Sequence, residues 1–289
     1  MADRSHSLID DKLEAMERHL SAIYSRANKE VTKKSKQYFD KFKSMDDQKR
    51  KLVDAGKLSN DEYKRWRQNK IMYGKKFSQM KKDIANQMLN VNKTATAYVN
   101  GKLPEMYSIG YNALENTVDG IGGYSFTLTD PNTVKNLATK DKTLLPYKTV
   151  NGKKDVRWNT KKVNAEILQG ILQGDSIPKI SKRLGNVTEM NRTSAIRNAR
   201  TSVTSAENWG RIKSYEKAQE DGVELVKEWV STNDDRTRET HALMNGETVP
   251  IDEPFSNGLM YPADPSGEPA EVYNCRCTMI VKVKGFKKV

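Results

Sequence analysis

Two short motifs near the end of this chain of 289 residues concentrate the side chains that bind metals and transfer protons. The first motif is Asp-Asp-Arg-Thr-Arg-Glu-Thr-His, residues 234–241, and the second is Asn-Cys-Arg-Cys, residues 274–277. Together they hold both cysteines of the chain and the only histidine outside its N-terminal region. Any chemistry that needs a thiol is therefore expected in these motifs.

A zinc site is one interpretation of the two motifs. His241, Cys275 and Cys277 are ligands of the type that zinc prefers, and Asp234 or Asp235 would supply a fourth. The Cys-x-Cys spacing is less usual than Cys-x-x-Cys. The alternative is that the cysteines are small buried residues at the start of a strand and that His241 bonds its neighbours.

Two enzymatic interpretations use the same residues. Cys275 or Cys277 would act as a nucleophile with His241 as its base, or a bound metal would hydrolyse phosphodiesters in the manner of a nuclease. The sequence shows neither a nucleophile elbow nor a second cluster of metal ligands. We therefore expect no catalytic residues and no enzyme.

A structural interpretation is favoured, because arginines alternate with carboxylates along both motifs. Arginine binds a carboxylate through two parallel hydrogen bonds, and such pairs would hold loops between strands. The predicted polar network consists of Asp234, Asp235, Arg236, Arg238, His241, Asn274, Cys275, Arg276 and Cys277.

The elements that must position the motifs are two strands and three preceding helices. Strands are predicted over 225–232 and 278–283, separated by a turn-rich segment with five prolines, from Pro250 to Pro269. Apolar spacing predicts a helix over 158–173, a short helix from Ser176 that closes at Gly185, and a third helix from Thr188 to about Ala218. Two or three strands in an α+β module follow from this pattern.

The first 120 residues are expected to be long helices. The periodic apolar positions from Leu8 to Val31 predict one or two helices over 8–42. Ser59 and Glu62 form a predicted capping box that opens a second long helix, with an apolar face from Trp66 to Met88. The chain is thus a mostly α-helical α+β protein with a basic helical arm (1–120), a connector (121–157) and a C-terminal module (158–289).

Basic charge is concentrated in two stretches of the chain. The net charge is +13, and residues 51–100 and 151–200 each carry 11 basic and 4 acidic groups. Such charge favours phosphate backbones or acidic protein surfaces, although a solvated helix face is the commoner explanation. The candidate DNA-binding residues are Lys75, Lys76, Lys81, Lys82, Arg192, Arg197 and Arg200.

Membrane and disulfide classes are excluded by simple features. No apolar run approaches the length needed to span a bilayer, and the N-terminus does not resemble a signal peptide. Two cysteines one residue apart do not make a disulfide framework. We expect synthesis in the cytoplasm.

Several motifs in sequence order resemble one known family. They are Arg-Asn-Ala-Arg-Thr-Ser (197–202), Trp-Val-Ser-Thr (229–232), the motif ending at His241, Asn-Gly-Glu-Thr-Val-Pro (245–250), Pro-Ala-Asp-Pro (262–265) and Asn-Cys-Arg-Cys. Residues 158–284 resemble the Mu F-like domain of head-morphogenesis proteins of tailed phages, whereas the N-terminal half is similar only in its helical, basic character.

The resemblance implies a minor head protein found in the virion, in the head interior or at the portal vertex. Its expected partners are the portal protein, double-stranded DNA bound without sequence preference, and a scaffold or major capsid protein. Ejection with the genome is also implied. A structural adaptor without DNA contact remains an alternative, and zinc is the one cofactor to consider.

Overall fold

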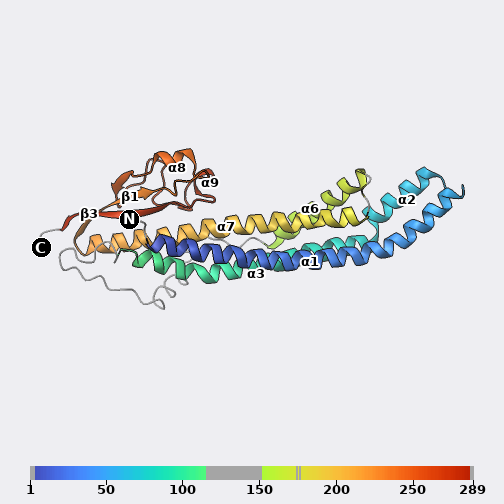
Figure 1. Cartoon of the computed structure of the whole chain (residues 1–289), viewed down its shortest axis with the longest axis horizontal. Coiled ribbons are helices and arrows are strands. Elements are labelled where there is room, and N and C mark those ends of the chain that lie inside the picture. Colours follow the sequence, from blue (N-terminus) through green and yellow to red (C-terminus); the bar gives the residue numbers. More distant parts are fainter. Residues whose placement is uncertain (1–3, 115–151, 174, 176, 287–289) are drawn as a thin grey trace. The chain divides into compact units, whose positions relative to one another are not determined.

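Long helices and one small antiparallel sheet make up the computed structural model, which describes residues 4–114, 152–173, 175 and 177–286 (Figure 1). The elements in chain order are α1 (Arg4–Asp54), α2 (Asn60–Tyr73), α3 (Lys75–Asn112), α6 (Gly152–Leu172), α7 (Ile177–Glu220), β1 (Val223–Val230), α8 (Glu239–Leu243), β2 (Thr248–Pro250), α9 (Pro269–Val272) and β3 (Thr278–Phe286). The predicted mostly helical α+β class is confirmed. Most of the connector predicted over 121–157 lies outside the described residues.

The described residues divide into two compact units, each built from separate stretches of the chain. The helical unit contains 19–96 and 152–195, and the sheet unit contains 4–18, 97–114 and 196–286. Helices α1, α3 and α7 each contribute to both units. The three predicted segments divide the chain linearly, whereas the sheet unit includes the first turns of α1.

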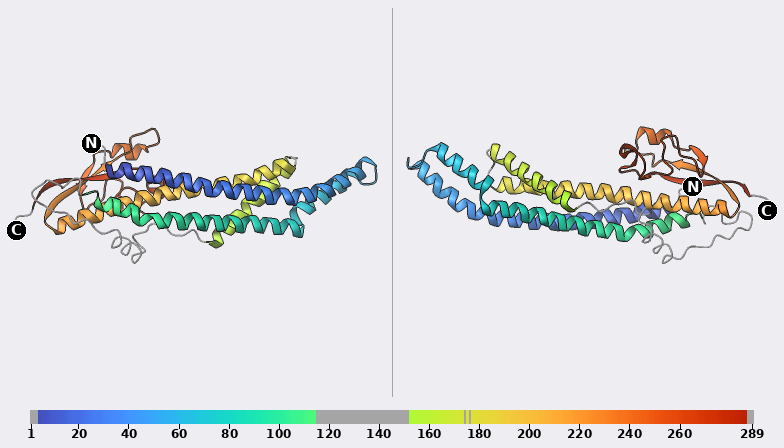
Figure 2. Two further views of the ribbon diagram at one scale, coloured as in Figure 1. Left: turned by 60° about the horizontal axis from the view of Figure 1, so that its bottom comes forward. Right: turned by 180° about the vertical axis from the view of Figure 1, so that it is seen from behind.

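The helical unit has an apolar core crossed by a chain of amides. Its buried residues come from α1, α3, α6 and α7, which lie side by side within this unit (Figure 2), and include Phe39, Phe77, Ile84, Val163 and Leu184. Tyr24 donates to Asn92, Asn92 to Asn191, and Asn191 to Asn159, at 2.6, 2.8 and 2.8 Å. Every helix of this core therefore takes part in one buried hydrogen-bonded chain.

Two helix boundaries follow local rules at the start and end of α2. The predicted capping box is confirmed, because the Ser59 hydroxyl accepts from the Glu62 backbone N–H while the Glu62 carboxylate accepts from the Ser59 N–H. The single helix predicted from Ser59 to Met88 is wrong, since Gly74 is extended (φ −63°, ψ 133°) and separates α2 from α3. A Cβ at Gly74 would lie 2.5 Å from the Lys70 carbonyl oxygen.

The sheet unit is organised by a three-stranded sheet with the order β2-β1-β3. Both pairings are antiparallel, with Trp229 opposite Met279 and Lys227 opposite Val249 and Val281. Residues alternate along β1 between buried and more exposed, as a half-buried strand requires. The core of the sheet unit also includes Ile212, Tyr215 and Ala218 of α7. The two predicted strands are confirmed, with a short third strand in the turn-rich segment.

Two further expectations about the helices are wrong. The helix predicted to close at Gly185 continues, and α7 runs without interruption from Ile177 to Glu220. A Cβ at Gly185 would lie 3.1 Å from the Asn28 side-chain oxygen, so the glycine permits close packing of α1 and α7 rather than a helix end. Leu8, assigned to the apolar face of α1, is 46% exposed.

Candidate functional site

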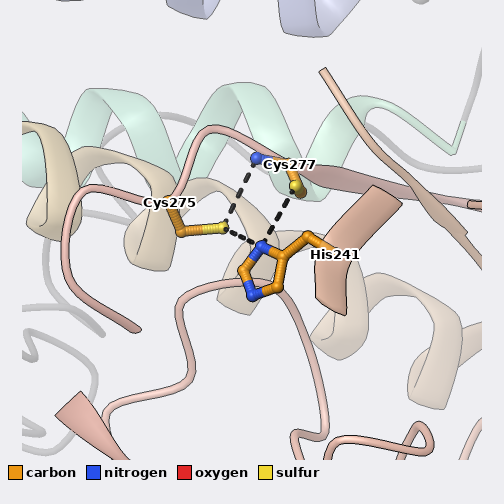
Figure 3. A group of neighbouring side chains, drawn as sticks. All are labelled: His241, Cys275 and Cys277. Carbon is orange, nitrogen blue, oxygen red and sulfur yellow. Dashed lines mark hydrogen bonds between the residues drawn. The ribbon is translucent and has the colours of Figure 1, made fainter. Parts of the chain in front are cut away.

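The side chains of His241, Cys275 and Cys277 meet in the sheet unit, with their ligand atoms all within 4.8 Å of one another. Figure 3 shows the His241 imidazole facing both sulfur atoms. Its Nδ1 lies 3.7 Å from the Cys275 Sγ and 3.5 Å from the Cys277 Sγ. All three residues are at most 2% exposed. The predicted grouping of these residues thus corresponds to a single buried cluster.

Cys275 and Cys277 stand directly before β3, which begins at Thr278. The backbone is fixed from α7, where the Thr204 hydroxyl donates to the Cys275 carbonyl at 2.9 Å and the Asn208 amide to the Cys277 carbonyl at 3.3 Å. The Cys277 N–H donates to the Cys275 Sγ at 3.4 Å. The two sulfurs are therefore held by backbone contacts as well as by packing.

The imidazole of His241 is oriented by contacts on its other side. Its Nε2 lies 2.9 Å from the carboxylate of Glu271 on α9. The ring also packs edge-on against Trp229, with centroids 5.2 Å apart. A carboxylate accepts from an N–H, so this contact assigns the proton to Nε2 and leaves the Nδ1 lone pair facing the sulfurs. Glu271 belongs to the site, although the motifs did not identify it.

The two thiols differ in their acidity. Hydrogen bonding to Cys275 lowers the pKa of Cys277 against the opposing effect of burial. Hydrogen bonding to Cys277, together with burial, raises the pKa of Cys275. The pair therefore loses its first proton more readily than an isolated buried thiol, with the negative charge on Cys277.

The predicted fourth ligand, Asp234, is not among the grouped ligand atoms. Both of its oxygens accept from the Arg276 guanidinium, at 2.6 Å each. Hydrogen bonding to Arg276 holds the pKa of the Asp234 carboxyl well below its usual range. Asp234 therefore takes part in an ion pair that connects the two motifs.

The other residues of the predicted polar network have varied positions. The guanidinium of Arg238 donates to the Tyr273 carbonyl, and that of Arg236 lies 3.4 Å from Asp234. Asn274 has a positive φ of 62°, and its side-chain oxygen accepts from Arg200 at 2.7 Å. Asp235 is exposed. Arg236, Arg238 and Arg276 also line a small pocket beside His241 and the cysteines.

A second buried polar group in the sheet unit was not predicted. Glu207 of α7 is fully buried, and its Oε1 lies 3.0 Å from His6 Nδ1, 3.1 Å from Arg211 Nη2 and 3.2 Å from the Thr278 hydroxyl. Burial opposes a charge on His6, but the attraction and hydrogen bond of Glu207 raise the pKa of His6 to about 9. The first turns of α1 are thereby attached to α7.

The candidate DNA-binding residues fall into two groups. Lys75, Lys76 and Lys82 are exposed on α3, and none of the ion pairs among the described residues involves them. Lys81 is half-buried, with its Nζ 4.9 Å from the Phe77 ring centroid.

The three arginines have protein partners. Arg192 pairs with Glu189 at 2.9 Å, and Arg200 pairs with Glu17 at 2.5 Å. Arg197 is exposed, with its guanidinium over the Tyr273 ring. The exposed lysines are therefore better placed to meet an external anion than Arg192 or Arg200.

No helix in the described part of the chain combines the length and hydropathy needed to cross a bilayer.

The two thiols are poorly placed for attack on a substrate, because Cys275 and Cys277 are 1% and 2% exposed. A nucleophilic cysteine has to be reached by its substrate. The geometry thus favours a structural or metal-binding role over that of a thiol nucleophile.

Comparisons with known proteins identify the region that contains this cluster. Residues 161–280 match the family described as Phage Mu protein F like protein. The chain is 34% identical over 126 residues to the NAD(+)–arginine ADP-ribosyltransferase EFV of Enterococcus faecalis, covering 43% of this chain and 26% of that protein. It is 27% identical over 128 residues to minor head protein GP7 of Bacillus phage SPP1, covering 41% and 39%.

No solved structure matches the chain. The chain spans about a quarter and about two fifths of the lengths of these two relatives. The family match includes α7, β1, β2, the first three residues of β3 and the residues of the buried cluster. Residues 161–280 are therefore identified as a domain that matches the Mu F-like family of phage proteins.

Proposed function

We propose that this chain is a minor head protein of a tailed phage, and that its helical unit binds the backbone of packaged DNA without sequence preference. The observation that carries the DNA-binding half is the distribution of charge between the units. The helical unit has 29 basic and 12 acidic residues, a net charge of +17, whereas the described residues of the sheet unit have 15 and 20, a net charge of −5. A phosphate backbone is the polyanion that such a surface favours.

Lys75, Lys76 and Lys82 give this charge a specific position on α3. All three are exposed, and Lys75 and Lys82 are seven residues apart, which places them on the same face of the helix. An exposed lysine that contacts a phosphate releases a counterion from the DNA, and this release drives binding. These lysines are the residues we expect to contact DNA first.

Association with the portal vertex, or with a scaffold or major capsid protein, is the second part of the proposal. It rests on the family and on the name of the SPP1 relative, a minor head protein. The protein would then be present in the virion, at the portal vertex or in the head interior, and ejection with the genome would follow from DNA contact.

Fluorescence anisotropy of the purified chain with two labelled duplexes of unrelated sequence tests the DNA-binding half. We expect equal affinities for the two duplexes, and log affinity should fall linearly with log salt between 50 and 200 mM, as for other backbone contacts. A sequence preference, or no binding at 50 mM salt, would contradict it.

A structural adaptor that contacts only proteins is the alternative to DNA binding. Co-purification of the tagged chain with its portal protein in high salt, together with failure to bind either duplex, would support the adaptor instead. Salt-sensitive duplex binding with or without portal capture would support the proposal.

A further inference from the structure

The nitrogen–sulfur distances in the buried cluster match those between ligands of one tetrahedral metal ion. With Zn–S bonds of about 2.3 Å and Zn–N bonds of about 2.0–2.1 Å, a nitrogen and a sulfur ligand lie about 3.5–3.6 Å apart. The two distances from His241 Nδ1 to the sulfurs are 3.5 and 3.7 Å. Both nitrogen–sulfur distances therefore agree with ordinary bond lengths from one ion to the imidazole and to each sulfur.

A hydrogen bond to the imidazole accounts for the position of only one of the two thiols. A neutral imidazole nitrogen has one lone pair or one N–H, so Nδ1 can form a good hydrogen bond with only one of the two thiols that it faces. The other buried thiol would then have no comparable partner on the imidazole. A metal ion uses both sulfurs and the nitrogen at once.

The surroundings of His241 and Cys275 provide independent support. A histidine that binds a metal through one nitrogen commonly donates from the other to a carboxylate, as the 2.9 Å contact between Nε2 and Glu271 allows. The backbone N–H of Cys277, directed at the Cys275 Sγ, would stabilise a metal-bound thiolate. The groups that make these two contacts, the Glu271 carboxylate and the Cys277 N–H, are additional to the three donor atoms.

We propose that Nδ1 of His241 and the Sγ atoms of Cys275 and Cys277 bind one Zn²⁺ ion, with Glu271 as a positioning residue. On binding, two thiol protons are released to solvent, and the charges of two thiolates and one Zn²⁺ cancel within the buried site. The described residues supply three donors, so water or another molecule completes the coordination. Arg236, Arg238 and Arg276 line the adjoining pocket, which favours an anion as that fourth ligand.

Metal analysis of the full chain, purified without chelators, tests the site directly. Mass spectrometry of the elements should find one zinc per chain, and Co²⁺ substitution should produce the absorption of a thiolate-to-cobalt charge transfer. A chain that arrives without metal and then binds neither Zn²⁺ nor Co²⁺ on titration would overturn the proposal, as would a disulfide between Cys275 and Cys277.

Substitutions at the proposed ligands and at Glu271 test which residues bind the ion. Cys275→Ser combined with Cys277→Ser should abolish binding, and Glu271→Gln should weaken it about 10- to 100-fold. The matched control is Asp234→Asn, which removes a nearby carboxylate that is paired with Arg276 and should leave one zinc per chain. Full metal content in the double cysteine variant would overturn the assignment.

The reactivity of the thiols in the wild-type chain can be measured without any variant, so this test does not require a variant to fold. Both thiols should react slowly with a thiol reagent when zinc is present, and faster after a strong chelator removes it. Equal rates in the two conditions would contradict the site. The result is independent of whether the helical unit binds DNA.

Discussion

The helical unit carries its charge on the surface, whereas the sheet unit buries several ionised groups. The helical unit has a net charge of +17, and its described buried polar residues are mainly amides and hydroxyls, with Asp46 and Asp175 as exceptions. The sheet unit has a net charge of −5 over its described residues, yet it buries Glu207, Arg211 and Lys227 at 2% exposure or less.

This difference separates two uses of charge. Exposed charges interact weakly with one another and are screened by salt, so they suit reversible contact with a polyanion. Buried charges have fixed partners, and the loss of one partner is costly. We therefore expect changes in the sheet unit to affect stability and changes on the helical surface to affect binding.

The largest effect is expected from Glu207→Gln in the sheet unit. The neutral amide would remove the carboxylate partner of the buried Arg211 and of the partly buried His6, which should lower the free energy of unfolding by about 3–5 kcal/mol. Hydrogen exchange of peptides from β1 and β3 measures this. The control is Glu216→Gln on the same helix, a partly exposed residue paired with Lys213, which should cost less than about 1 kcal/mol. Equal losses in the two variants would contradict the comparison.

A smaller loss is expected from Asn191→Ala in the helical unit. The change removes the hydrogen bonds that the Asn191 side chain makes with Asn92 and Asn159, and each such loss at a buried site costs about 1–3 kcal/mol. We expect a total of about 2–4 kcal/mol, seen as faster exchange in peptides of α3 and α6. Asn164→Ala, at an exposed position of α6, is the control. Unchanged exchange in the Asn191 variant would mean that the amide chain does not stabilise this core.

The pH dependence of the His6–Glu207 pair should be the smallest of the three effects. The folded pKa of His6 is about 9, above the unfolded value of about 6.5, so its contribution is complete below pH 6.5 and disappears as the pH rises through 9. The difference in stability between wild type and His6→Gln should therefore shrink from pH 6 to pH 9, by about 2 kcal/mol. Urea unfolding at several pH values measures it, and a constant or growing difference would contradict the assignment.

Local patterns in the sequence predicted much of the fold. The capping box at Ser59, the amphipathic helices and the strands that contain Trp229 and Met279 depend on neighbouring residues, so a single sequence contains their signals. The helix end predicted at Gly185 is wrong. A glycine within a helix costs about 1 kcal/mol, and packing against Asn28 offsets this cost. That contact joins residues far apart in the chain.

The candidate site was predicted only in part, for the same reason. The motifs identified His241, Cys275 and Cys277, which share a buried cluster, but Asp234 pairs with Arg276 instead. Glu271 lies in a turn-rich segment without a periodic pattern, and Glu207 is 201 residues from His6. Their roles depend on tertiary contacts that residue spacing does not encode.

The central proposal is that the helical unit binds DNA and the sheet unit does not. The salt dependence of DNA binding in two triple variants tests it most directly. The first variant replaces three exposed lysines of the helical unit with glutamine: Lys75, Lys76 and Lys82. The second replaces three exposed lysines of the sheet unit with glutamine: Lys102, Lys217 and Lys284. Anisotropy at 50 to 200 mM salt gives the slope of log affinity against log salt. The first variant should have a slope shallower by about 2–3, because each lost phosphate contact contributes about 0.9, and the second should keep the wild-type slope. Equal slopes in the two variants would contradict the account.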